Sequence, residues 1–245
     1  MAKQTKGFCK YCGKEYTRTG MIRHLEVCKE KENLFALVKE KVKYYELVLY
    51  GKYNKDYWLI VQVKENATLE DLDQFIRDIW VECCGHLSAF EICGQRYESN
   101  PAEDFFGEEP AKSMNCKLKK VLERGMQMEY EYDYGSTTEL VIRVQDYYNA
   151  PDQKEEITIL SRNNPPQFVC SVCGENDAAW VNPEGFYDGT PFFCEECLQK
   201  LEEGNIELDQ ECDFVPEFLL PVCNSPRMGV CGYEGSDCYP DQFEP

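Results

Sequence analysis

The clearest pattern of hydrophobic and polar positions lies in the central part of the chain. Two segments rich in β-branched and aromatic residues, 45–50 and 57–63, flank the turn-rich connector GKYNKD and predict a β-hairpin. In the next segment, 69–80, apolar residues recur at the spacing of one helical face: Leu69, Leu72, Phe75, Ile76 and Ile79. Thr68 predicts the N-cap of this helix, and Asp71 completes a capping box. The apolar face of the helix is therefore expected to lie in the core.

Further strands are predicted after this helix. One is expected at 89–93, a second hairpin at 126–134 and 140–147, and a short last strand at 157–160. Together with the first hairpin and the helix, these elements predict an α+β fold. The domain is expected to have a mixed central sheet and to begin, along the chain, with a hairpin, a helix and a strand. We place this domain at 44–162, before a linker rich in Asn and Pro.

Four candidate metal ligands lie near the N-terminus at a spacing typical of zinc sites: Cys9, Cys12, His24 and Cys28. The first two thiols share a tight turn, and the last two ligands, four residues apart, share one helical face. Tyr16 and Met21 stand where a two-Cys-two-His zinc finger has core residues. Eleven residues separate the two ligand pairs, one fewer than the usual gap of about twelve. We expect a zinc-folded ββα module at 1–31 and a helical linker at 32–43.

A second set of candidate ligands lies in the C-terminal third: Cys170, Cys173, Cys194 and Cys197. Twenty residues separate its two pairs, a spacing that resembles a zinc ribbon or treble-clef module. Four thiolates predict a closed structural site with no coordination position left for catalysis. The acidic region 167–245 is therefore expected to hold a zinc-ribbon-like module followed by a Cys-rich tail.

The tail has four further cysteines at irregular spacing: Cys212, Cys223, Cys231 and Cys238. They are interpreted either as a third metal site or as free reduced thiols. The expected cofactor is accordingly zinc, as two ions, with a third if the tail also binds metal.

Composition and charge indicate the compartment of the protein and the partners that it can bind. Fifteen cysteines in a 245-residue chain without an export signal favour a reducing, cytoplasmic compartment over a disulfide scaffold. No apolar run approaches the ~20 residues of a membrane span, so no membrane partner is expected. The net charge is −19, yet residues 1–31 hold eight Lys/Arg and three Asp/Glu. Because an acidic body repels phosphate backbones, any contact with nucleic acid is expected to be made through residues 1–31.

Three segments of the central domain carry a family resemblance. They are the hairpin and helix start (YELVLYGKYNKDYWLIVQV and TLEDLDQFI), HLSAFEICGQRY at 86–97 and YEYDYG at 130–135. The stretch LPVCNSPRMGVCGY at 220–233 also looks like a tail of zinc-knuckle-bearing relatives. Over roughly 44–148 the chain resembles the plasmid pRiA4b ORF-three-like family, also labelled as insertion-element passenger TnpR proteins. The resemblance implies a mixed α+β fold and a plasmid or mobile-element origin.

No recombinase chemistry follows from this resemblance. The family commonly continues after the YEYDYG-type motif with an acidic residue, a Trp and a His, whereas this chain has STTEL at 136–140. The Tyr-x-Arg-x-Ser pattern of serine recombinases and the His-x-x-Arg pair of tyrosine recombinases are absent. Gly-rich phosphate loops and HExxH motifs are absent as well. We therefore expect no catalytic residues and no enzyme.

Four residues are candidates for ligand binding: His86, Asp133, Asn224 and Arg227. His86 is interpreted either as a capping or core-edge histidine or as a ligand contact. Asp133, close to a glycine, is expected to stabilise the end of a hairpin. Arg227 is interpreted either as a buried arginine paired with acidic groups or as a group that recognises a carboxylate or phosphate.

The function expected from these patterns is binding. The chain is predicted to be a zinc-binding, non-catalytic adaptor or nucleic-acid-associated protein whose basic finger contacts DNA, RNA or a protein partner. One finger reads about three base pairs, so a protein partner or an oligomer must supply further specificity. Two alternatives stay open. One is a small-ligand-binding or nucleotide-binding protein or enzyme that uses His86, Asp133 and the Arg227 loop. The other is an acidic protein that mimics nucleic acid.

Overall fold

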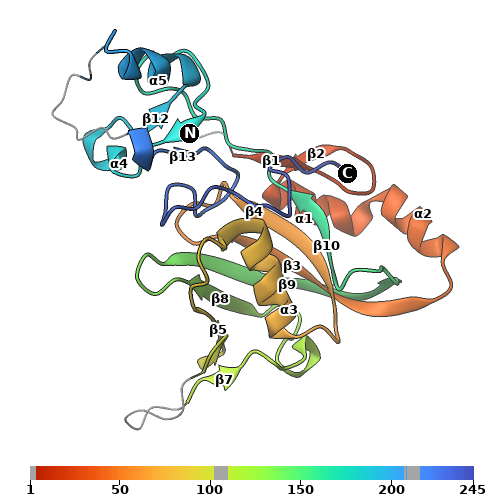
Figure 1. Cartoon of the computed structure of the whole chain (residues 1–245). Helices are drawn as coiled ribbons and strands as arrows, with labels where there is room; N and C mark the ends of the chain where they lie inside the picture. The colour runs from red at the N-terminus through yellow and green to blue at the C-terminus, as the bar shows by residue number, and fades with distance from the viewer. Residues whose placement is uncertain (1–3, 102–109, 207, 209–215) are drawn as a thin grey trace.

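A computed structural model describes the chain except residues 1–3, 102–109, 207 and 209–215. The largest element among the described residues is an eight-stranded sheet with the strand order β10-β4-β3-β9-β8-β5-β6-β7 (Figure 1). Its strands are β3 (Lys41–Gly51), β4 (Trp58–Lys64), β5 (Ser88–Ile92), β6 (Gln95–Glu98), β7 (Lys112–Ser113), β8 (Gln127–Tyr132), β9 (Thr138–Pro151) and β10 (Ile157–Arg162). Neighbouring strands are antiparallel except β6 and β7, which are parallel. The sheet is thus mixed, and the predicted α+β fold is confirmed.

Both predicted hairpins are present in this sheet. β3 and β4 pair in a register that sets Leu47 opposite Val61, and β8 pairs with the start of β9. β3 begins earlier than predicted, because its first residues pair with the far end of β9, where Lys41 lies opposite Pro151. The start of the strand therefore falls within the segment that was expected to be a helical linker.

Helix α3 (Leu69–Ile76) covers one face of the sheet (Figure 1). The predicted capping box is present: the N–H of Asp71 donates to the Thr68 hydroxyl (3.1 Å), and the N–H of Thr68 donates to the Asp71 carboxylate (2.7 Å). All five apolar residues of the predicted face are buried. The α-helix ends earlier than predicted, because the chain widens into a π-helical turn at Arg77–Val81. None of the helices in the described part of the chain is long and apolar enough to span a membrane.

The N-terminal module packs on the opposite face of the sheet. It consists of β1 (Lys6–Phe8), β2 (Glu15–Thr17), α1 (Arg18–Val27) and α2 (Lys29–Leu37), so the predicted ββα order is observed. Its buried residues form one cluster with residues of β3, β4 and β10: Cys9, Met21, Leu25, Cys28, Val48, Trp58, Ile60 and Leu160. These sheet residues alternate with those that face α3, so they belong to the other side. The ββα module is therefore part of the main body of the molecule.

Backbone contacts also join this module to the edge strand β10. Gly7 lies so close to the strand that a Cβ added to it would stand 2.0 Å from the carbonyl oxygen of Arg162. Only glycine fits such an approach. The N–H of Lys10 donates to the carbonyl of Leu160 (2.9 Å). These contacts hold the first pair of candidate metal ligands against the central domain.

A smaller module follows the central domain and lies at one end of the molecule (Figure 1). It contains β11 (Trp180–Val181), α4 (Gly185–Asp188), β12 (Phe192–Phe193), α5 (Glu195–Glu202) and β13 (Leu220–Pro221), and its strands form a sheet in the order β12-β11-β13. Short 3-10 turns occur at Pro216–Phe218 and, in the central domain, at Leu118–Lys120. After β13 the chain returns to the central domain, where the hydroxyl of Ser225 donates to the carbonyl of Trp80 (2.5 Å).

Replacement of Leu25 by Ala is expected to lower the free energy of unfolding by about 2–5 kcal/mol, because the lost side chain leaves a cavity between α1 and the sheet. Leu34→Ala is the matched control. Leu34 is 43% exposed, so a change of under about 0.5 kcal/mol is expected. Urea unfolding measures both variants, and equal stabilities would contradict the docking of this module on the sheet.

Candidate metal centres

Three groups of cysteine and histidine side chains each bring four ligand atoms to within 4.8 Å of one another in the described part of the chain. The N-terminal group is Cys9, Cys12, His24 and Cys28; the central group is Cys83, Cys84, His86 and Cys231; the C-terminal group is Cys170, Cys173, Cys194 and Cys197. The structure thus brings together the residues of both predicted ligand sets. It also forms a central group that the spacing of the cysteines did not indicate.

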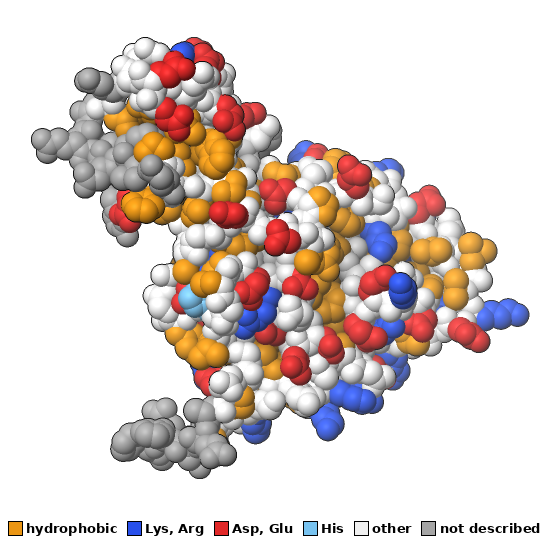
Figure 2. All heavy atoms as spheres, in the orientation of Figure 1, with side chains coloured by type: hydrophobic (Ala, Val, Ile, Leu, Met, Phe, Trp, Pro, Cys, Tyr) orange, Lys and Arg blue, Asp and Glu red, His pale blue; other side chains and the backbone are white. Residues whose placement is uncertain are grey.

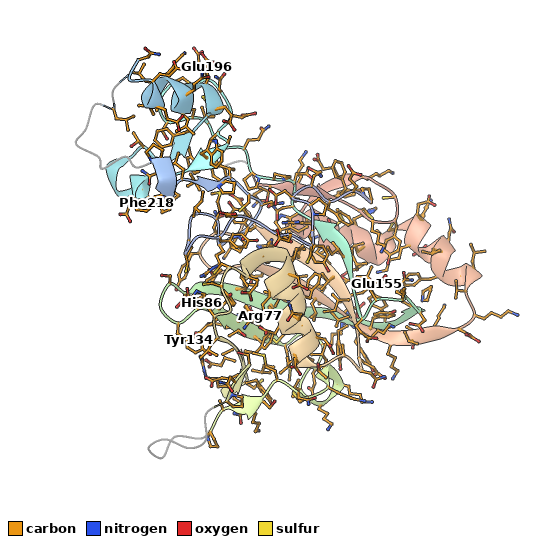
Figure 3. The ribbon with its side chains drawn as sticks, in the orientation of Figure 1. Arg77, His86, Tyr134, Glu155, Glu196 and Phe218 are labelled. Atoms are coloured by element: carbon orange, nitrogen blue, oxygen red, sulfur yellow. The ribbon has the colours of Figure 1, made fainter. Side chains whose placement is uncertain are left out.

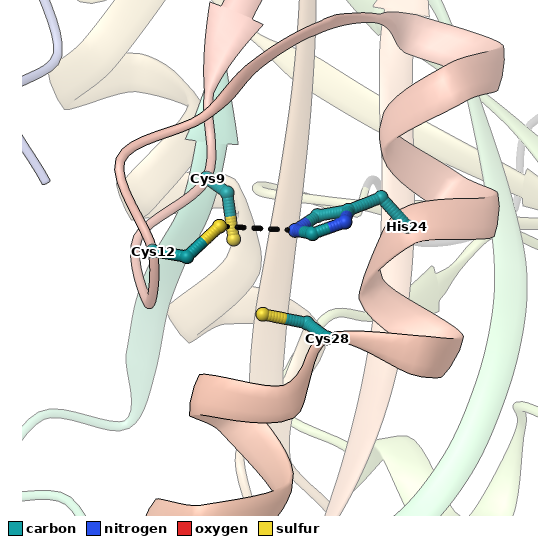
Figure 4. Close-up of side chains that lie close together, drawn as sticks. All are labelled: Cys9, Cys12, His24 and Cys28. Carbon is teal, nitrogen blue, oxygen red and sulfur yellow. Dashed lines mark hydrogen bonds between the residues drawn. The ribbon is translucent and has the colours of Figure 1, made fainter.

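The N-terminal group is assembled by the ββα order (Figure 4). Cys9 and Cys12 lie on the turn between β1 and β2, where the N–H of Gly13 donates to the carbonyl of Cys9 (2.9 Å). His24 lies in the last turn of α1, and Cys28 is the C-cap of that helix. The Sγ atom of Cys12 and the Nε2 atom of His24 are 3.2 Å apart. All four side chains therefore converge on one point.

The surroundings of the N-terminal group favour cation binding. The ring of His24 stacks on Tyr16, with centroids 4.3 Å apart, which holds its orientation. Burial, and then the charge of Lys14, lowers the pKa of His24, so the imidazole is neutral at pH 7, the form that binds metal. Burial raises the pKa of Cys9 to about 12. A bound cation would compensate the charge of this thiolate and allow it to form.

The C-terminal group joins a turn to the start of a helix. The turn that carries Cys170 and Cys173 is closed by the N–H of Gly174, which donates to the carbonyl of Cys170 (2.9 Å). Cys194 is the N-cap of α5, and Cys197 lies in the first turn of that helix. Thiolates at this position are stabilised by the positive end of the helix dipole.

The thiols of the C-terminal group differ in acidity. Hydrogen bonds from the backbone N–H groups of Asn176 and Glu175 lower the pKa of Cys173 to about 7. Burial, and then the neighbouring thiols, raise the pKa of Cys197. The Cys173 thiolate therefore forms readily, and a divalent cation would favour ionisation of Cys197 as well.

The central group comes from two distant parts of the chain. Cys83, Cys84 and His86 lie between the π-helical turn and β5, and Cys231 comes from the tail. The Nε2 atom of His86 lies 3.0 Å from the Sγ atom of Cys84 and 3.3 Å from that of Cys231. The Sγ atoms of Cys83 and Cys84 are 3.7 Å apart. Cys84 and Cys231 are exposed, whereas each of the other groups has at least two buried thiols.

A buried ion pair lies beside the central group. Arg227 is fully buried and donates to the Oδ2 atom of Asp133 (2.8 Å), which is also 3.5 Å from Nε2 of His86. The other terminal N–H groups of Arg227 reach a backbone carbonyl (3.1 Å), the Thr138 hydroxyl (3.0 Å) and the Sγ atom of Cys83 (3.4 Å). The guanidinium thus connects the tail, the β8–β9 hairpin and one thiol of the group.

Both partners of this ion pair are held in their charged forms. Burial alone would raise the pKa of Asp133, but hydrogen bonds from Arg227 and from the backbone N–H groups of Gly135 and Ser136 outweigh it and lower the pKa. Burial would likewise lower the pKa of Arg227, but the hydrogen bonds to Asp133 and Cys83 raise it. The pair is therefore ionised at neutral pH.

The family of the chain follows from a comparison with known proteins. A family model described as Plasmid pRiA4b ORF-3-like protein matches residues 48–177, more than half of the chain. The chain belongs to this family. A solved structure, that of the protein of unknown function MM3350 from Methanosarcina mazei Go1, is 24% identical over 51% of this chain and 71% of that chain, with a TM-score of 0.43. No curated protein matches the chain.

Only some of the candidate ligands lie in the range that matches the pRiA4b ORF-3-like family. It contains Cys83, Cys84 and His86 of the central group and the first pair of the C-terminal group, Cys170 and Cys173. The whole N-terminal group and the ligands after residue 177 lie outside the matched range. The central and C-terminal groups are thus each completed by residues that the family model does not cover.

Three of the four residues predicted to bind a ligand meet in the structure. His86, Asp133 and Arg227 lie together as described, and Arg227 has the buried, paired environment that was one of its two interpretations. Asn224 has a different place. It is fully buried, and its side-chain N–H donates to the carbonyl of Asn163 (2.8 Å). Asn224 therefore supports the path of the tail and does not line the central group.

The cysteines of the tail do not form a group of their own within the described residues. Cys212 lies outside those residues. Cys223 is buried, Cys238 is exposed, and Cys231 joins the central group instead. Spacing along the tail could not indicate this arrangement, because the partners of Cys231 come from a segment about 145 residues earlier. The sequence signal for the central group is the clustering of Cys83, Cys84 and His86 within four positions.

Asp133→Asn is expected to destabilise the protein by about 3–5 kcal/mol, because it leaves the buried guanidinium of Arg227 without its charged partner. The double variant with Arg227→Met is expected to lose less than the sum of the two single variants. Glu156→Gln, at an exposed ion pair with Lys64, is the control and should change stability by under about 1 kcal/mol. Strictly additive losses in urea unfolding would show that the two residues do not act as a pair.

Proposed function

We propose that this member of the pRiA4b ORF-3-like family is a zinc-binding, non-catalytic protein that presents its metal-stabilised modules to a protein partner. One zinc ion is placed in the N-terminal group and one in the C-terminal group. The observation that carries the proposal is that both sets of four ligand atoms converge within 4.8 Å. Four protein ligands fill a tetrahedral zinc ion, which is the arrangement of structural sites.

The chemistry of the ligands favours zinc over other metals. Thiolates and imidazole are ligands of zinc, whereas magnesium and calcium prefer oxygen. Zn–S bonds of about 2.3 Å and Zn–N bonds of about 2.0–2.1 Å place a sulfur and a nitrogen ligand about 3.5 Å apart. The distance of 3.2 Å between Cys12 Sγ and His24 Nε2 agrees with this geometry.

The basic residues of the N-terminal module support a protein partner better than a nucleic acid. Lys31 pairs with the buried carboxylate of Glu46 (3.4 Å), and the guanidinium of Arg18 stacks over Tyr50 at 4.1 Å from the ring centroid. These two cations are engaged inside the protein. The charge available for phosphate contacts is thus smaller than the sequence alone suggests.

An exposed apolar surface on the same module is of the kind that protein partners cover. Val27 is 67%, Leu34 43% and Leu37 82% exposed. Figure 2 shows hydrophobic side chains at the end of the molecule that α2 occupies in Figure 1. Exposed aliphatic side chains on one module are candidate contacts for a protein partner.

The arrangement around Arg227 supports a structural role over catalysis. His86, Asp133 and Arg227 do meet, as an enzyme or a nucleotide-binding protein would require. The terminal N–H groups of Arg227, however, are directed at four groups of the protein itself. A fully buried guanidinium with these partners has no terminal donor left for a phosphate or carboxylate ligand.

Elemental analysis of the protein, purified with zinc under reducing conditions, tests the two zinc sites. Cys12→Ser and Cys170→Ser are each expected to remove one zinc ion per chain, because a tetrahedral site loses affinity with one ligand gone. Cys116→Ser is the control, since this thiol belongs to none of the three groups. Zinc contents that are the same in all three variants would refute the assignment.

Fluorescence anisotropy with a labelled mixed-sequence DNA duplex tests the choice of partner. We expect no saturation up to protein concentrations on the order of 10 µM at about 0.15 M salt, because two cations of the module are engaged inside the protein and the net charge of the chain is −19. The comparison protein carries Lys14→Glu and Arg23→Glu, both at exposed positions of the N-terminal module. Binding that weakens steeply with salt and is lost in this variant would favour a nucleic-acid partner instead.

A further inference from the structure

We propose that Cys83, Cys84, His86 and Cys231 form a third metal site, which takes a single zinc ion and fastens the C-terminal tail to the central domain. The site is independent of the two zinc ions of the terminal modules, since it shares no ligand with either of them. Three sulfur ligands and one imidazole are a donor set of structural zinc sites.

The distances within the central group are close to the edges of a zinc tetrahedron, with one nitrogen–sulfur distance about 0.5 Å shorter. Zn–S bonds of about 2.3 Å place two thiolates about 3.8 Å apart, and a thiolate and an imidazole nitrogen about 3.5 Å apart. The Sγ atoms of Cys83 and Cys84 are separated by 3.7 Å. The Nε2 atom of His86 lies 3.0 Å and 3.3 Å from its two sulfur neighbours. One ion at the centre can therefore reach all four atoms with little movement.

Hydrogen bonds hold the segment that carries three of the ligands. The guanidinium of Arg77 donates to the carbonyl of His86 (2.7 Å), and the N–H of His86 is 3.3 Å from the Tyr132 hydroxyl. The N–H of Gly85 donates to the carboxylate of Glu82 (2.6 Å). Ligands supported in this way are already oriented for the metal.

The charge near the central group also suits zinc. Three thiolates and one neutral imidazole leave a zinc centre with a net charge of −1. Arg227 is already paired with Asp133 (2.8 Å), and its guanidinium also donates toward the Sγ atom of Cys83 (3.4 Å). A guanidinium donor beside a thiolate stabilises the ionised sulfur that the metal requires.

The ion would connect two segments that have no strand pairing between them. Cys231 lies about 145 residues after His86, in a tail that has no helix or strand after β13 in the described residues. Its backbone has a φ of +51°, a left-handed conformation that is unusual for a residue other than glycine. A metal bond from Cys231 would hold this conformation and close the long loop between the two segments.

The site is more open to solvent than the two sites of the terminal modules, because none of its four ligands is buried. Cys84 and Cys231 are exposed, and Figure 2 shows a histidine at the surface where Figure 3 labels His86. Exposed thiols that are free react with alkylating reagents, whereas a zinc-bound thiolate is protected. This contrast provides a test that needs no mutation.

The first experiment is alkylation of the full-length, zinc-loaded protein with iodoacetamide, before and after treatment with a chelator. Cys238 is the internal control, because it is exposed in the same tail but belongs to none of the groups. With zinc present, Cys84 and Cys231 are expected to react at least about tenfold more slowly than Cys238, and after chelation at similar rates. Equal rates in the zinc-loaded protein, or a Cys83–Cys84 disulfide found by peptide mass spectrometry, would overturn the proposal.

The second experiment compares zinc content and tail proteolysis. Cys231→Ser and His86→Gln are each expected to bind one zinc ion fewer than the wild-type protein and to be cleaved faster after β13. Cys238→Ser should match the wild type in both measurements. If these variants kept their zinc, Cys12→Ser and Cys170→Ser would still each be expected to lose one zinc ion. The terminal sites are therefore tested separately. Unchanged zinc content, or unchanged cleavage in Cys231→Ser, would refute a metal bond that fastens the tail.

Discussion

Burial of both faces of the central sheet is the constraint on which the rest of the structure depends. The buried residues of β3 and β4 run almost continuously along the strands instead of alternating with exposed ones. Leu59 and Val61 lie in the core under α3, whereas Trp58 and Ile60 lie in the core under the N-terminal module. A sheet with this pattern needs a cover on each side. The ββα module is therefore a structural part of the domain as well as a candidate metal site.

Polar contacts between buried groups help to determine the path of the tail. Arg162, which is 1% exposed, donates to the carbonyls of Asn224 and Pro240, both at 2.7 Å. The side chain of Asn163 donates to that of Asn224 (2.7 Å). Buried donors must find partners, so a tail placed elsewhere would leave these groups unsatisfied. The Arg227–Asp133 pair, beside the central group, is a further buried polar contact that holds the tail in place.

The three metal groups relate differently to the apolar core. In the C-terminal module Cys170, Cys194 and Cys197 form a buried cluster with Val172 packed against it, so three of the ligands are part of the core. Small modules bury little apolar surface, and a bound metal would supply folding free energy to this one. The N-terminal group shares its core with the sheet. The central group lies at the surface of a domain with a large core of its own, and a metal there adds a connection between segments.

The sequence by itself determined the features whose residues are close together along the chain. The hairpins, the capped helix at Thr68 and the ligand sets of the two terminal modules follow from spacing and turn chemistry, because each forms within a few tens of residues. Only the tertiary structure decided that Cys231 is the cysteine of the tail that meets His86, and that Arg227 and Asp133 pair in the interior. It also decided where the π-helical turn at Arg77–Val81 ends the helix before Cys83, Cys84 and His86. Contacts between such distant residues leave no periodicity in the sequence, since they depend on how the whole sheet and its two covers pack.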